Sequence, residues 1–97
     1  MTSYETVYLA ADKERVARHV SERVPHLRQV RTDGAIEFRT NVGHHLATLS
    51  DATTDSGARG SRIRYRTSRI RPHLFHAHNK ARQIRKAVEK FRAPDAR

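Results

Sequence analysis

The spacing of the apolar residues constrains the fold of this 97-residue chain more than any other feature, because it changes between a strand period and a helix period. Residues 4–10 alternate, with Val7 and Leu9 on one face, and this pattern predicts a strand. Beyond Asp12 the apolar side chains recur every three or four positions, which predicts a helix over residues 13–24 with Asp12 as its N-cap. The chain therefore begins as a strand followed by a helix.

The middle of the chain alternates as strands do. Two alternating runs flank Asp33-Gly34, a dipeptide that favours a two-residue hairpin turn. Ile36 and Phe38 share one face of this hairpin, so that face is expected to pack in the core. A further short strand is expected over residues 45–50, although its inward face is ambiguous.

Residues 51–61 are small and polar, which predicts a loop. Residues 62–71 then alternate, which predicts a strand with Ile63 and Tyr65 directed inward. Ile70 is out of step with this alternation, so the sequence indicates either a bulge near residues 67–68 or the end of the strand.

The strongest periodicity belongs to the end of the chain. Pro72 suits the first turn of a helix, and the helix is expected to end before Pro94. Its apolar stripe consists of Leu74, Ala77, Ala81, Ile84, Val88 and Phe91. The order of elements (β-α-β-β-β-β-α) predicts an α+β fold, with an antiparallel sheet of four to five strands, two helices, and the long C-terminal helix packed on the sheet. We expect one domain over residues 1–97, with a disordered tail at 93–97.

Positive charge is concentrated in the last part of the chain. The net charge is +10, yet residues 1–58 hold seven basic and eight acidic side chains, whereas residues 59–97 hold thirteen basic and two acidic ones. Ten of those thirteen are arginine, whose planar fork suits phosphate or carboxylate oxygens. An anionic partner, such as nucleic acid or a ribonucleoprotein, is therefore the main functional expectation.

The candidate phosphate contacts lie on the predicted last strand and last helix, which share one sign of charge and are expected to form one continuous positive patch. Alternate arginines on a strand stand about 7 Å apart, so a row of them can follow a phosphate backbone. The candidates are Arg62, Arg64, Arg66, Arg69, Arg71, Lys80, Arg82, Arg85, Lys86 and Lys90. Such charges can also serve only to solvate exposed faces, and a bias towards arginine can arise from genome composition. Tyr4 and Tyr8 share the outward face of the first strand, where they could stack bases or complete an interface.

Other chemistry has little support in the sequence. There is no cysteine, no glycine-rich phosphate loop and no paired carboxylate, so we expect neither a catalytic site nor a cofactor. His73 and His76 could share a helix face, but their positive surroundings disfavour a metal ion, and a response to pH is the better expectation. No segment resembles a membrane span or a secretory signal, so a cytoplasmic protein is expected.

The first strand, its continuation Ala10-Ala11-Asp12-Lys13-Glu14-Arg15-Val16 and the helix from Pro72 to Phe91 resemble a shortened domain of the START-like, polyketide-cyclase-type superfamily. The resemblance implies a sheet that grips a long C-terminal helix and an apolar ligand cavity between them, and it carries over no catalytic or binding residue. The alternative to nucleic-acid binding is therefore a ligand pocket lined by Phe38, Ile63, Leu74 and Ile84. A third hypothesis is an interaction module that forms homo-oligomers through its sheet edges or docks on an acidic partner.

Overall fold

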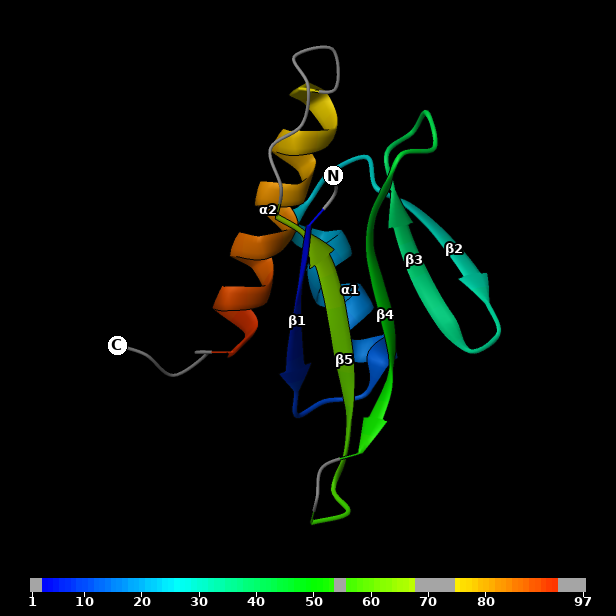
Figure 1. The fold of residues 1–97 in the computed structure, drawn as a ribbon, viewed down its shortest axis with the longest axis vertical. Helices are drawn as coiled ribbons and strands as arrows, with labels where there is room; N and C mark the ends of the chain where they lie inside the picture. The colour runs from blue at the N-terminus through cyan, green and yellow to red at the C-terminus, as the bar shows by residue number, and fades with distance from the viewer. Residues whose placement is uncertain (1–2, 54–55, 68–74, 93–97) are drawn as a thin grey trace.

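Five antiparallel strands form one sheet, and two helices pack on one of its faces (Figure 1). In the computed structural model, which describes residues 3–53, 56–67 and 75–92, the elements follow the order expected from the sequence. They are β1 (Tyr4–Leu9), α1 (Lys13–Arg23), β2 (Arg28–Thr32), β3 (Ala35–Arg39), β4 (His45–Thr53), β5 (Arg59–Arg66) and α2 (Phe75–Arg92). The sheet order is β1-β5-β4-β3-β2, so the first strand lies beside the last. The predicted α+β class is confirmed.

The core lies between the sheet and the two helices. Because successive side chains of a strand point to opposite faces, one face of β1, β3, β4 and β5 supplies apolar groups to this core. The strands contribute Val7, Leu9, Ile36, Phe38, Leu49, Ile63 and Tyr65, and the helices contribute Val16, Val20, Ala77, Ala81, Ile84 and Val88. Burial of these residues against one face leaves the opposite face of the sheet without a helix over it.

The hairpin between β2 and β3 turns at Asp33-Gly34, as the sequence predicts. Both residues have positive φ angles, 46° and 81°, which the two-residue turn requires. The side chains of β4 that face the core are set by a shift in its pairing with β3, which the sequence did not reveal. The register with β3 shifts between Phe38 and Arg39, so that Leu46 and Ala47, although adjacent, are both fully buried.

The predicted loop over residues 51–61 is largely wrong. β4 continues to Thr53 and β5 begins at Arg59, so most of these small polar residues pair across the two strands. Two of them also make tertiary contacts, because the Ser61 hydroxyl donates to the Ala11 carbonyl at 2.8 Å and Asp51 accepts from Lys13. Composition predicted a loop because the small polar residues by themselves do not reveal their cross-strand and tertiary partners.

Three expectations fall outside the residues that the structure describes. They are the course of the chain around Ile70, the start of the last helix at Pro72, and the tail at residues 93–97. Of the helices that are described, neither α1 nor α2 has the length and apolar character needed to cross a membrane.

Replacing Asp12 tests the predicted start of α1. Its carboxylate accepts from the Arg15 backbone N–H at 3.0 Å, which satisfies a donor that the helix itself cannot pair. We expect Asp12→Ala to lower the free energy of unfolding by about 1 kcal/mol and Asp12→Asn, which keeps an acceptor, to change it by a few tenths. Urea denaturation measures both, and equal losses in the two variants would contradict the capping role.

Candidate nucleic-acid interface

The open face of the sheet, which α1 and α2 leave uncovered, carries a row of arginines on β5. Arg62, Arg64 and Arg66 alternate with the buried Ile63 and Tyr65, so the predicted orientation of this strand is confirmed. Arg62 and Arg64 are exposed, whereas Arg66 at the end of the strand is half-buried. The sheet register places Tyr8, Thr6 and Tyr4 of β1 opposite these three arginines in turn.

Acidic side chains are concentrated away from the open face. Within residues 3–53, 56–67 and 75–92, Glu37 is the one carboxylate on that face, and it pairs with Arg39 at 2.8 Å. Other carboxylates pair with cations of the helix-covered side or of the helices themselves: Asp51 with Lys13, Glu14 with Arg31, Glu22 with Arg23, and Glu89 with Arg85. Arg62 and Arg64 form no ion pair with any described carboxylate.

Tyr4 holds Arg64 in place on the open face. The Arg64 guanidinium carbon lies 4.1 Å from the centre of the Tyr4 ring, which is a cation–π contact. The Tyr4 hydroxyl lies 3.1 Å from Nδ1 of His45, and Nε2 of His45 lies 2.7 Å from the Thr48 hydroxyl. This chain of contacts crosses three neighbouring strands and fixes both the tyrosine ring and the guanidinium group.

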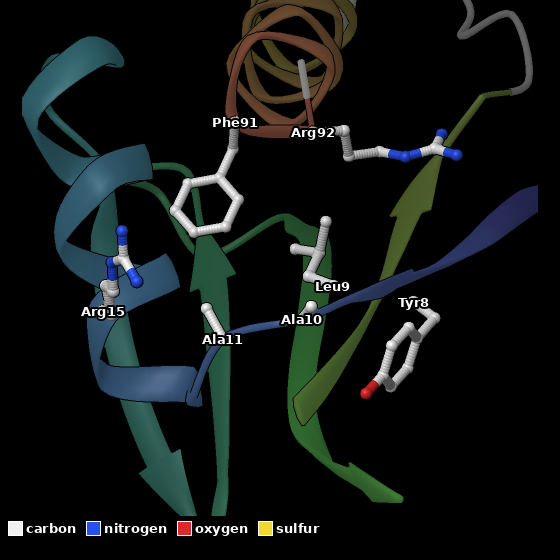
Figure 2. Close-up of a pocket in the computed structure, with 7 residues that line it drawn as sticks. All are labelled: Tyr8, Leu9, Ala10, Ala11, Arg15, Phe91 and Arg92. Carbon is white, nitrogen blue, oxygen red and sulfur yellow. The ribbon is translucent and has the colours of Figure 1, made fainter. Parts of the chain in front are cut away.

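Tyr8 occupies a different environment at the other end of β1. Its side chain lies against Gly60 of β5, where an added Cβ would stand 2.4 Å from the Tyr8 hydroxyl oxygen and 2.7 Å from the ring carbon that bears it. Tyr8 and Leu9 leave β1 on opposite sides, so that Leu9 points towards α2 and Tyr8 points away from it (Figure 2). Tyr8 is 37% exposed, which makes it an accessible aromatic group beside the arginine row.

No pattern in the sequence indicated this role for Gly60. Because Gly60 falls in the segment that composition predicts as a loop, the flexibility of a loop was enough to explain a glycine at this position. The pairing of β5 with β1 is non-local, and only that pairing brings the Tyr8 ring over residue 60.

The lysines of α2 do not join the β5 arginines in one continuous patch, because α2 packs on the covered face of the sheet. Lys80 is 6% exposed, and its ammonium group donates to the Pro25 carbonyl, so it is a buried structural contact and not a surface cation. Lys86 and Lys90 border a groove with Arg23 of α1, on the helical side of the molecule. The predicted convergence therefore fails for these lysines.

Arg82 and Arg85 approach β5 more closely. Together with Arg66 they border a hollow of about 250 Å³ at the end of the strand. At this hollow, cations of α2 lie beside the last arginine of the β5 row. Arg69 and Arg71 lie outside the described residues.

The described residues that were predicted to line the alternative ligand pocket adjoin no cavity. The side chains of Phe38, Ile63 and Ile84 are 0% exposed and belong to the core, which leaves no water-accessible cavity against them. Leu74 lies outside the described residues. This packing counts against a ligand cavity between the sheet and α2 at these positions.

A separate surface cleft of about 370 Å³ lies where β1, α1 and α2 meet (Figure 2). Leu9 and Ala11 border its base, and the Arg15 guanidinium carbon lies 5.7 Å from the centre of the Phe91 ring. Arg92 also borders it. Arg15 and Arg92 therefore belong to the helical side of the molecule and not to the arginine row on β5.

The histidines whose side chains are described belong to no metal-binding group. No group of three or more His, Cys, Asp or Glu side chains that could hold a metal ion occurs in the described part of the chain. The predicted pair of His73 and His76 lies outside the residues whose side chains are described.

No protein-family model matches this chain, and comparison with curated proteins and with solved structures gives no match either.

Replacing Gly60 tests the contact with Tyr8. A Cβ at this position would also stand 2.5 Å from the Leu9 carbonyl oxygen, which belongs to the backbone and cannot rotate away. We expect Gly60→Ala to lower the free energy of unfolding by about 1–3 kcal/mol, the range typical of overpacking. Arg62→Ala, at the next outward position of β5, should stay within about 0.5 kcal/mol of the wild type in the same urea titration. A Gly60→Ala protein as stable as the wild type would contradict the contact.

Acidification tests the environment of His45. Burial lowers the pKa of His45 below its usual value; Glu37 raises this pKa, whereas Arg39, Arg66 and Arg64 lower it. The unfolded chain therefore binds more protons than the folded one as the pH falls through about 6.5. The free energy of unfolding should therefore decrease as the pH falls from about 6.5 to the lower pKa that His45 has in the folded state.

Urea midpoints measured between neutral pH and mildly acidic pH check this expectation. His45→Gln should show a shallower loss of stability on acidification than the wild type. His44→Gln, which removes the neighbouring imidazole, provides the matched control. Equal pH dependence in the two variants would show that His45 does not contribute as described.

Proposed function

We propose that this protein is a non-enzymatic, cytoplasmic nucleic-acid-binding protein that contacts phosphates through the open face of its sheet. Arg62 and Arg64 are its central phosphate contacts, with Arg66 at the end of the same row. The observation that most supports this function is the segregation of charge: the exposed β5 arginines have no described carboxylate partner, while most acidic groups lie elsewhere.

The geometry of β5 also supports phosphate contact. Guanidinium groups can donate two parallel hydrogen bonds to phosphate oxygens, and alternate side chains on a strand stand about 7 Å apart along one line. The cation–π contact with Tyr4 holds the Arg64 group before any partner arrives, so less side-chain entropy is lost on binding. A sheet face of this kind, with aromatic rings beside cations, suits an extended polynucleotide.

Paired substitutions of equal charge test the location of the interface. Arg62→Ala/Arg64→Ala removes two cations from the open face, whereas Lys86→Ala/Lys90→Ala removes two from the groove on the helical side. We expect the arginine variant to lose about tenfold or more in affinity for a mixed-sequence oligonucleotide at low salt, measured by fluorescence anisotropy. Its plot of log affinity against log salt should be less steep by about 1.4, the value for two phosphate contacts on a single strand.

The lysine variant should retain most of the wild-type affinity and salt dependence. Larger losses in the lysine variant than in the arginine variant would place the interface on the helices. If the wild type does not bind the oligonucleotide at low salt, or binds it with an affinity that does not depend on salt, the proposed function itself is contradicted.

A further inference from the structure

Tyr4 and Tyr8 lie on the same face of β1 but differ in what their rings can do. The Tyr4 ring is covered by the Arg64 guanidinium at 4.1 Å, and its hydroxyl contacts His45. Tyr8 takes part in neither kind of contact among the described residues and is the more exposed of the two. Tyr4 therefore acts as a support for Arg64, whereas Tyr8 presents an aromatic surface to solvent.

Gly60 gives Tyr8 a firm backing. Any side chain at residue 60 would collide with the Tyr8 hydroxyl and the adjacent ring carbon, so the ring rests directly on the backbone of β5. A ring supported in this way loses little conformational freedom when a planar group stacks on its outer side. Such a platform is what base stacking on a protein requires.

The nearest cation to this platform by strand pairing is Arg62. Tyr8 and Arg62 are direct cross-strand partners in the β1–β5 register, and Thr6 and Arg64 form the next pair on the same face. Directly paired side chains have Cβ atoms about 5 Å apart. An aromatic surface and a guanidinium group thus lie side by side, as the base and phosphate of one nucleotide do.

We propose that Tyr8 stacks an unpaired base and that Arg62 and Arg64 hold the adjoining phosphates, so that the partner is a single-stranded nucleic acid. This inference rests on the proposed function and adds its substrate class. In a duplex the base faces are stacked on one another and cannot reach a flat sheet surface, so a duplex contacts only the arginines. The site therefore selects single strands over duplexes.

An abasic oligonucleotide separates stacking from phosphate contact. Anisotropy titrations at low salt would compare a labelled single strand of mixed sequence, its duplex, and an abasic strand of the same length. We expect Tyr8→Ala to weaken binding of the single strand by about 5- to 100-fold and to leave binding of the abasic strand and the duplex nearly unchanged. Tyr8→Phe, which keeps the ring, should retain most of the affinity.

A tryptophan at residue 8 gives an independent readout, because the chain has no other tryptophan. In Tyr8→Trp the indole emission should change when the single strand binds and stay constant with the abasic strand. Tyr4→Trp is the matched control at the covered position, where the emission should change far less.

Equal weakening of all three ligands by Tyr8→Ala, or an unchanged Tyr8→Trp emission during binding, would overturn base stacking while leaving phosphate binding intact. Equally tight binding of an acidic polypeptide such as polyglutamate would also overturn it, since the partner would then need no bases. Absence of salt-dependent binding to any oligonucleotide would instead remove the proposed function, so the two failures are distinguishable.

Discussion

The structure depends on the coverage of one sheet face by both helices. This arrangement makes the alternation along β5 decisive, because Ile63 and Tyr65 enter the core between β1 and β4 while Arg62 and Arg64 are left in solvent. The two sets cannot exchange faces, since a shift by one residue would bury guanidinium groups and expose the core. The cationic surface is thus a direct consequence of how the core is packed.

The same arrangement of layers separates most acidic side chains, on the helical side, from the arginines of the open face. Most ion pairs of the helical side, such as those between Arg31 and Glu14 and between Arg23 and Glu22, are exposed and contribute little to stability. Their main effect is to neutralise acidic groups away from the open face. With Glu37 compensated by Arg39, the positive potential of β5 faces solvent beside Tyr4 and Tyr8.

Sequence patterns predicted the elements well where local chemistry determines them. The N-cap at Asp12, the Asp33-Gly34 turn and the inward direction of Ile63 all follow from residues close in the chain. The burial of Lys80 against Pro25 and the seating of Tyr8 on Gly60 depend on partners far away in sequence. The last residues of β4 pair with nearby residues of β5, and they were missed because small polar residues are typical of loops. The outward direction of Arg62 and Arg64 was predicted correctly from local alternation, whereas the patch that they were expected to share with the lysines of α2 depends on tertiary packing and is not formed.

The central claim is that the open face, and not the helical layer, receives the polyanion. Backbone amide chemical shifts of the labelled protein, recorded while a single-stranded oligonucleotide is added at low salt, test this claim residue by residue. We predict that the largest changes occur on β1 and β5, around Tyr8, Arg62 and Arg64, with small changes along α2. Changes centred on α2 and the α1–α2 groove, with β1 and β5 unaffected, would contradict the account.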